Sequence, residues 1–384
     1  MNRRAAIVGI GYTPARTVTP EVSYRELTYD AAVKAYEDAG IQPRDVDSFV
    51  CCEEDFIEGI SITDEYAPDQ LGAVMKPVHT VGGDGIHGLA DAYMEILTGA
   101  YDIVVVESHS KASNVLTMDH IIHYAMDPVW NRPFRANPHF VAGLEMNRFC
   151  HETGTTVEQC SQVVVKNRKN ALRNPSGAYS ASLTLEDVAG SKPVADPLRE
   201  LDIAGPSDAA FVVVLASAER AKTLKGRPIW IKGVGWCNDT PTLESRSWSR
   251  AEYAELAAAQ AYKQAGIRNP AGEIDLFEVD DSYGYKELQH LEALKVFDRG
   301  EAGKATQRGV TERTGRVPVN VSGGALGMGH MVDANGLARV VEVGLQLRGQ
   351  AGERQVPGAR TGLAMGWRGV PTTSGAVAIL SADE

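Results

Sequence analysis

The sequence lacks the features that define several protein classes. No run approaches the roughly 18 apolar residues of a membrane helix, and the N-terminal stretch has too few apolar residues for a secretory signal. The chain also lacks a positive charge balance: 38 basic residues face 50 acidic ones, for a net charge of −12. A surface that follows nucleic-acid phosphates is therefore not expected. We expect a cytoplasmic protein that binds neither membrane nor nucleic acid.

Cysteine is scarce as well. The 384 residues include five cysteines, and none forms a CxxC pair or another spacing typical of metal ligands. We therefore expect no metal site and a reducing compartment. What the chain does contain is an ordinary globular composition, with 43% hydrophobic and 23% charged residues, which suits a full core.

The order of predicted strands and helices occurs twice. The first copy opens with a buried strand over 5–11 and a helix that ends Ala-Tyr-Glu-Asp-Ala-Gly-Ile over 35–41. The second copy opens with a strand over 229–236 and a helix that ends Ala-Tyr-Lys-Gln-Ala-Gly-Ile over 261–267. Two further echoes follow in the same order. They pair 46–49 with 274–277 and 78–83 with 319–324. This repetition indicates a duplicated α/β unit.

We expect two similar α/β halves, residues 1–227 and 228–384, packed face to face. Their glycine loops would meet at a shared site, where helix N-termini supply positive dipole ends. The first half carries an inserted region over about 110–180. Within it, 116–139 mixes aromatic, Met, Pro and His residues without a period, which is typical of a flap over a substrate. A loop for dimer packing is the alternative.

The stretch 317–330 holds the most distinctive pattern of the chain. An extended apolar run ends in Ser-Gly-Gly, and a second pair of glycines leads to His330. Glycine permits positive φ and close approach to the backbone, so the N–H groups of Gly323 and Gly324 are candidate donors for an oxyanion or a thioester carbonyl. His330 beside them would move protons. A tight strand-to-helix turn with a structural histidine is the other interpretation.

These features resemble the thiolase superfamily, and in it the lipid-transfer-protein (sterol-carrier) branch. The resemblance spans nearly the whole chain. The motifs that carry it are the opening Ala-Ile-Val-Gly-Ile-Gly, the stretches 97–106 and 166–175, the Asn-x-x-Gly-Gly…Gly-His pattern of 320–330, and the tail 369–375. The tail is similar to branch members that act as retro-aldolases on acyl-CoA.

The resemblance implies a thiolase-like, five-layer αβαβα fold with two pseudo-symmetric halves. It also implies coenzyme A thioester substrates and a homodimeric core, and branch members often pair with a small zinc-ribbon/OB-fold protein. Coenzyme A would enter as part of the acyl-CoA substrate, and no tightly bound cofactor is expected.

The sequence departs from the family pattern at the nucleophile. Thiolases carry a cysteine at the N-terminus of the helix after the first glycine loop, where the helix dipole lowers the thiol pKa. The matching residue here is Gly82, and no cysteine occurs between Cys52 and Cys150. Asp280 stands where the family has a histidine, and the late cysteine is missing from the turn 364–369. Of the usual acid and base set only the histidine of the glycine loop remains.

Without a thiolate there can be no acyl-enzyme at the usual place, but carbon–carbon chemistry on a thioester remains possible. A retro-aldol step needs a base for a hydroxyl proton and donors for an enolate oxygen, which His330, Asp280 and the Gly323 and Gly324 N–H groups can supply. Known retro-aldolases of the branch have tyrosines in place of Asp280 and His330. Asp280 as a solvated or ion-paired residue is the alternative. Further candidates are Asp281, Tyr283, Asp84 and His87.

We therefore predict a CoA-thioester lyase of the retro-aldol or Claisen type. A thiolase-type acyltransferase, such as an acetyl-CoA acetyltransferase, and a non-catalytic CoA-binding subunit are the alternatives. In this family the predicted helix over 156–173 approaches the coenzyme, so its basic residues would suit the phosphates, although a solvated face is the other interpretation. These residues are Lys166, Arg168, Lys169 and Arg173.

Overall fold

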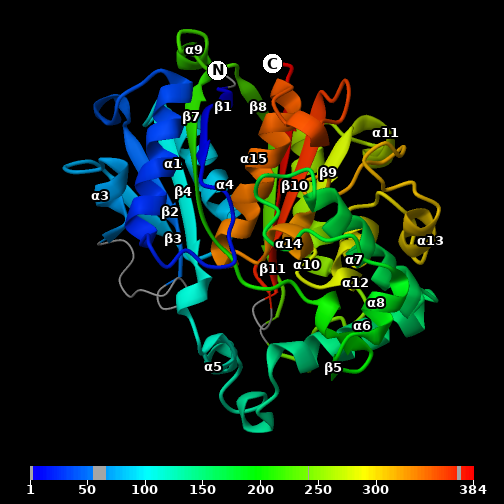
Figure 1. Ribbon diagram of the computed structural model, residues 1–384. Helices are drawn as coiled ribbons and strands as arrows, with labels where there is room; N and C mark the ends of the chain where they lie inside the picture. The colour runs from blue at the N-terminus through cyan, green and yellow to red at the C-terminus, as the bar shows by residue number, and fades with distance from the viewer. Residues whose placement is uncertain (1–2, 55–65, 241, 370–372) are drawn as a thin grey trace.

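The computed structural model describes residues 3–54, 66–240, 242–369 and 373–384, so residues 370–372 of the tail motif lie outside the described residues. Within these ranges one sheet has the strand order β3-β2-β4-β7-β1-β8-β11-β10-β9 (Figure 1). Its strands are β1 (Ala5–Tyr12), β2 (Ser48–Cys52), β3 (Val78–Val81), β4 (Ile103–Lys111), β7 (Asp208–Ser217), β8 (Ile229–Asn238), β9 (Leu276–Glu278), β10 (Thr361–Trp367) and β11 (Ser374–Ser381). A separate pair, β5 (Pro193–Ala195) and β6 (Leu198–Arg199), lies outside this sheet.

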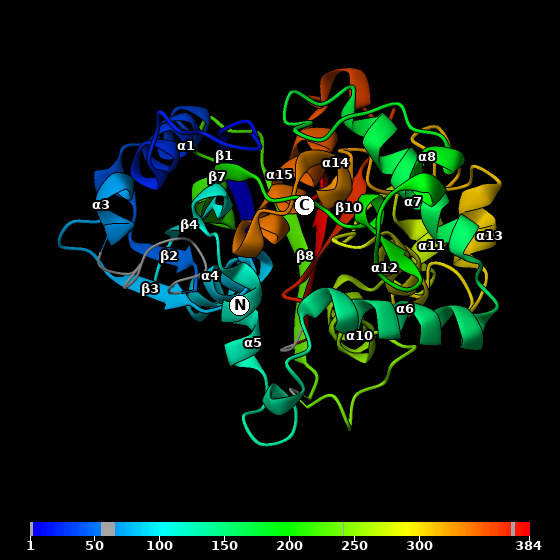
Figure 2. The ribbon, with the colours of Figure 1, turned by 60° about the horizontal axis from the view of Figure 1, so that its bottom comes forward.

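Helices cover the sheet in layers. Helix α1 packs on the outer face of the N-terminal strands, α10 packs on the outer face of the C-terminal strands, and α4 and α15 lie side by side between them (Figures 1 and 2). The helices are α1 (Tyr24–Ala39), α3 (Pro68–Leu71), α4 (Gly85–Thr98), α5 (Met118–Ala125), α6 (Pro138–Thr153), α7 (Val157–Ala171), α8 (Leu185–Gly190), α9 (Ala218–Ala221), α10 (Glu252–Ala265), α11 (Pro270–Glu273), α12 (Gly284–Ala293), α13 (Ala302–Gln307), α14 (Gly324–Met328) and α15 (Asn335–Arg348). This is the predicted αβαβα order.

The two halves repeat the same pairings. Phe49 of β2 pairs with Val78 of the parallel strand β3, and Phe277 of β9 pairs in parallel with Val319. Strands β1 and β8 are equivalent and pair with each other, so the two halves join into one sheet at its middle. The echoes seen in the sequence therefore correspond to equivalent positions in space.

Glycine lets the first strand of each half approach its outer helix. A Cβ at Gly9 would lie 2.3 Å from the carbonyl oxygen of Ala35 in α1, and a Cβ at Gly233 would lie 2.3 Å from that of Ala261 in α10. No larger side chain fits at these contacts. The α/β class and the pseudo-symmetric halves are confirmed, whereas Arg227 as a domain boundary stays a prediction.

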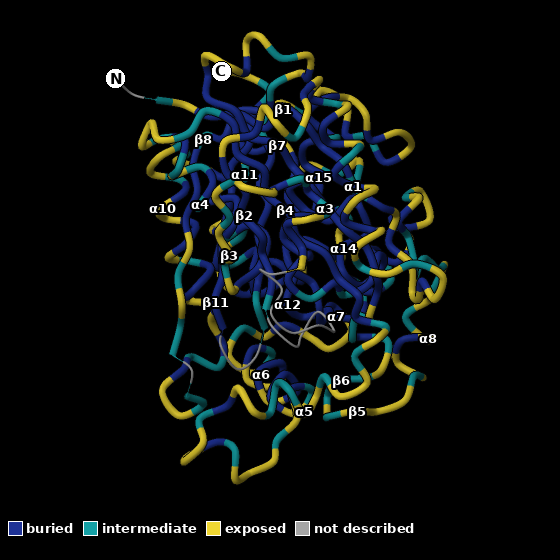
Figure 3. Tube along the Cα trace, turned by 90° about the vertical axis from the view of Figure 1, so that its left-hand side faces the viewer, coloured by how far each residue is buried: buried dark blue, intermediate teal, exposed yellow. Residues whose placement is uncertain are grey.

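The core is divided by the sheet into a central and two outer parts. Along β2 the side chains alternate: Cys52 joins the central cluster with Leu89 and Leu337, whereas Cys51 joins the outer cluster beneath α1. Figure 3 shows the buried trace running through the strands and the central helices, with exposed residues concentrated at the periphery. None of the described helices is long and apolar enough to cross a membrane.

The chain between β4 and β7 holds the region that the sequence predicted as an insertion. Its first part, with α5, projects from the body of the molecule (Figures 1 and 2). Several large apolar side chains there are exposed, among them Leu116, Trp130 and Phe134. Helix α7, by contrast, packs against α12 and α14 beside the glycine loop.

Candidate active site

The N-termini of α4 and α15 meet at the buried side chain of Asp84. Its Oδ1 accepts a hydrogen bond from the N–H of Ile86 (3.0 Å) in α4, and its Oδ2 accepts one from the N–H of Gly336 (2.7 Å) in α15. A Cβ at Gly336 would lie 1.7 Å from this carboxylate, so only glycine fits. Burial raises the pKa of Asp84 to about 6. One carboxylate thus caps two positive helix ends, one from each half.

Gly82, which the family pattern predicts to be at the place of the thiolase nucleophile, is exposed between β3 and α4. A Cβ built on it meets no atom within 4 Å. Cys52 lies nearby behind the start of α4, with its Sγ 3.9 Å from the carbonyl oxygen of Gly85. Burial raises the pKa of the Cys52 thiol well above its ordinary value. Among the described cysteines, none offers a thiolate at this place.

His330 lies between α14 and α15 and is held by its neighbours in a defined protonation state. Its main-chain N–H donates to the carbonyl of Gly205 (2.7 Å), and its Nδ1 accepts from the N–H of Val332 (3.3 Å). An imidazole that accepts at Nδ1 carries its proton on Nε2 when neutral. Burial lowers the pKa of His330. At neutral pH the ring therefore offers an Nε2–H donor rather than a positive charge.

Asp280 follows β9 and is fully buried in an ion pair. Its Oδ1 accepts from the N–H of Ser282 (2.9 Å), and its Oδ2 accepts from Nη2 of Arg339 in α15 (2.7 Å). Burial alone would raise the pKa of Asp280, but the Arg339 guanidinium holds it below its ordinary value. An ionised carboxylate in such a pair is a weak base. Its charge acts on His330, so its contribution to a reaction would be electrostatic.

A carboxyl group of the protein itself, that of Asp281, is bound at the glycine loop. The carboxylate of Asp281 accepts hydrogen bonds from the N–H groups of Ala325 (2.6 Å) and Leu326 (3.3 Å) in α14. Gly323 and Gly324, with φ of +105° and +59°, each donate their N–H at 3.0 Å to acceptors inside the loop. The expectation that these two N–H groups face an oxyanion is therefore not supported by the bonding. Burial raises the pKa of Asp281 to about 7, and its role here is to cap α14.

A histidine that the sequence interpretation did not single out adds a second proton-handling group. Nδ1 of His139, at the start of α6, lies 3.2 Å from the hydroxyl of Tyr283, and the two rings meet edge to face. Burial lowers the pKa of His139 and raises that of Tyr283. His139 interacts electrostatically with His330, and Tyr283 does so with Asp280. The sequence feature that could have indicated His139 is its position at the end of the irregular, aromatic-rich segment 116–139.

The four basic residues of α7 and its C-terminal turn divide into two pairs. Lys166 is buried, with its Nζ 3.1 Å from Oε1 of Glu287. Arg168 is also buried, with its guanidinium 5.7 Å from the centre of a tyrosine ring. Lys169 and Arg173 are exposed and lie four residues apart, which places them on one side of the helix end. Only this second pair is placed to meet a phosphate in solution.

Comparison with known proteins agrees with this geometry. Residues 237–382 match the family model described as "Thiolase C-terminal domain-like". The chain is 32% identical to an acetyl-CoA acetyltransferase of Methanothermobacter thermautotrophicus, over 94% of this chain and 95% of the relative. It is 31% identical to a steroid side-chain-cleaving aldolase of Thermomonospora curvata, over 99% and 98%.

A solved structure of the Ltp2-ChsH2(DUF35) aldolase is similar throughout, with a TM-score of 0.86 and 28% identity over 99% of this chain and 98% of that one. The fold and the meeting of the α4 and α15 N-termini thus define a thiolase-like α/β protein. The chain belongs to the thiolase superfamily and, as its motifs indicated, to the lipid-transfer-protein (sterol-carrier) branch.

Proposed function

We propose that this chain is a thiolase-fold enzyme that makes or breaks a carbon–carbon bond in a CoA thioester without forming an acyl-enzyme. The observation that carries the proposal is Gly82: the place of the family's nucleophile is open and holds no thiol. Cys52, the nearby candidate, is buried and protonated. The similarity to a steroid side-chain-cleaving aldolase and to the Ltp2-ChsH2 aldolase supports a lyase of the retro-aldol type.

In the retro-aldol direction, the β-hydroxyl of the acyl-CoA substrate loses its proton and the Cα–Cβ bond breaks. A carbonyl compound leaves, and the electron pair remains as a thioester enolate. Water protonates the enolate at Cα, and the proton taken from the hydroxyl returns from the base to solvent. The Tyr283 hydroxyl relays the departing proton to Nδ1 of His139, whose lowered pKa keeps it neutral and able to accept. The Nε2–H group of His330 donates to the enolate oxygen. Asp280, held in place by Arg339, acts on this histidine through its charge.

For the coenzyme, the exposed pair Lys169 and Arg173 provides the phosphate contacts in this proposal. Replacing both by alanine should raise KM for the acyl-CoA severalfold at low ionic strength and leave kcat unchanged. Replacing Lys222 and Lys225, which lie at the junction of the halves, provides a control of equal charge. If the two double variants behave alike, the assignment of α7 to the phosphates is wrong.

A second candidate function is acyl transfer, favoured by the 32% identity to an acetyl-CoA acetyltransferase. It requires a thiol that becomes acylated. Incubation with acetyl-CoA followed by mass spectrometry of the intact protein separates the two functions: the lyase should remain unlabelled, and a stable acetyl adduct on any native cysteine would refute the lyase proposal. A non-catalytic CoA-binding subunit is the remaining alternative, and measurable cleavage of a β-hydroxyacyl-CoA that is lost in His330→Ala would exclude it.

We further propose that the chain forms a homodimer and works with a zinc-ribbon/OB-fold partner protein. Strand β3 lies at an edge of the described sheet, with His79 and Thr80 exposed, and such an edge can pair with a second strand. The similar Ltp2-ChsH2(DUF35) aldolase has two components in its name, which supports a partner for this chain. Light scattering on the purified chain tests the dimer. A cytoplasmic location stays a prediction from composition.

A further inference from the structure

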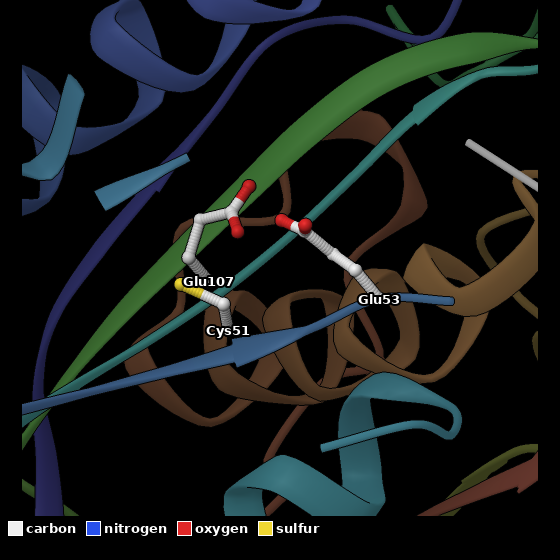
Figure 4. Close-up of side chains that lie close together, drawn as sticks. All are labelled: Cys51, Glu53 and Glu107. Carbon is white, nitrogen blue, oxygen red and sulfur yellow. The ribbon is translucent and has the colours of Figure 1, made fainter. Parts of the chain in front are cut away.

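A second group of chemistry-bearing side chains lies on the outer face of the N-terminal strands, away from the proposed reaction. Cys51 and Glu53 come from the end of β2 and the residue after it, and Glu107 and His109 come from β4. All four are fully or almost fully buried beneath α1. One donor atom from each of Cys51, Glu53 and Glu107 lies within 4.8 Å of the other two (Figure 4).

The hydrogen bonds in this group do not satisfy its carboxylates. Nδ1 of His109 lies 3.0 Å from one oxygen of Glu107 and 3.0 Å from one oxygen of Glu53. A single ring nitrogen bonds to Glu107, and Thr28 of α1 also donates to Glu107 (3.2 Å). Among the described residues, three carboxylate oxygens of this group have no hydrogen-bond partner. They are both oxygens of Glu53 and Oε2 of Glu107.

The buried carboxylate of Glu53, whose oxygens lack a hydrogen bond, indicates that a ligand binds here. Its side chain is 0% exposed, and its carboxylate faces that of Glu107 in Figure 4. Two buried carboxylates in contact repel each other when both are ionised, and a buried charge without a partner is costly. A cation between them would remove the repulsion and use the oxygens that lack a hydrogen bond. The nearby Cys51 sulfur adds a soft donor, which magnesium and calcium do not favour.

We propose that Cys51, Glu53 and Glu107 bind a divalent transition-metal ion of the Zn²⁺ class, with His109 holding Glu107 in place. Sulfur and carboxylate oxygen are both ordinary zinc ligands, and a histidine bonded to a ligating carboxylate fixes its orientation. Binding would deprotonate the Cys51 thiol and the Glu53 carboxyl and release both protons to solvent. Because the site lies on the opposite face of the sheet from α4, the ion would join β2 to β4 rather than take part in the reaction. Sequence spacing could not show this site because its ligands come from two strands.

The experiment uses untagged full-length protein that has been treated with a chelator and then titrated with Zn²⁺ or Co²⁺ alone. We expect about one ion per chain, a thiolate-to-cobalt charge-transfer band, and a rise in Tm with Zn²⁺. Cys51→Ser should abolish the band, and Glu53→Gln should weaken Zn²⁺ binding by at least the roughly 10- to 100-fold seen when a supporting residue is lost.

Cys52→Ser is the matched control, because Cys52 is adjacent and equally buried but faces the central core. It should keep both the band and the affinity. Circular dichroism checks the fold of each variant, and the cobalt spectrum of the wild type decides thiolate ligation even if a variant does not fold. Absence of one-to-one binding to the folded wild type, or equal binding by Glu53→Gln, would overturn the proposal and leave a carboxyl pair that shares a proton.

Discussion

Replacing Gly82 by cysteine would restore a thiol at the place where the family's nucleophile stands. The structure predicts that the fold accepts this change. Gly82 is exposed, its backbone is not in the left-handed region, and an added Cβ meets no atom within 4 Å. We expect the free energy of unfolding to stay within about 0.5 kcal/mol of the wild type, as for most surface substitutions.

The reactivity of the introduced thiol follows from its surroundings. The N-terminal end of α4 lowers its pKa, and the buried Asp84 carboxylate between the two helix ends offsets part of that effect. We therefore expect a pKa near the ordinary value of about 8.5, which leaves about a quarter of the groups as thiolate at pH 8. Native Cys52, whose pKa burial raises well above normal, stays a thiol under the same conditions.

The assay is incubation with acetyl-CoA at pH 8, followed by peptide mass spectrometry. Gly82→Cys should carry an acetyl group on the introduced residue, and the wild type should carry none. Gly190→Cys is a matched control, because Gly190 at the end of α8 is also exposed with no atom within 4 Å of an added Cβ. Labelling of a native cysteine in the wild type, or equal labelling of both variants, would refute the claim that Gly82 marks the place of a missing nucleophilic thiol.

Three further predictions test the site. His330→Ala should lower kcat for thioester cleavage by about 10²- to 10⁴-fold with unchanged circular dichroism, and an unchanged kcat would contradict its role. Arg339→Met should lower the free energy of unfolding in urea by about 3–5 kcal/mol, because it leaves the Asp280 carboxylate buried and unpaired; a loss below about 1 kcal/mol would argue against the pair. Asp84 and Asp281 have pKa values raised to about 6 and about 7, so the folded state holds their protons longer than the unfolded chain. Their contribution to the free energy of unfolding should therefore fall as pH rises from about 4 through 7, whereas the buried histidines with lowered pKa contribute with the opposite sign. The test is the difference between variants: relative to the wild type, Asp281→Asn should lose part of the fall between pH 4 and 7, and an identical pH dependence of the two proteins would contradict the shift at Asp281.

Local sequence patterns predicted the parts of the molecule that local physics controls. The buried strand over 5–11 and the helix that ends at Gly40 appear as β1 and α1, since apolar periodicity and a glycine stop act over a few residues. The duplicated halves followed from repetition of such patterns. The absence of a cysteine near Gly82, where the family pattern predicts the nucleophile, was evident from the sequence alone.

The pairing of charges across the fold was decided by tertiary structure. Nothing near Asp84 in the sequence indicates that it caps α15 as well as α4, because Gly336 lies 252 residues away. In the same way Asp281, proposed from sequence as a catalytic group, occupies the anion site of the glycine loop, and His139 meets Tyr283 across 144 residues. Such contacts depend on strand register and on how two halves close on each other. The sequence by itself therefore determined the repeated scaffold and the missing thiol, and the packing of distant segments decided which of the remaining polar groups, such as Asp84 and Asp281, are bonded within the protein.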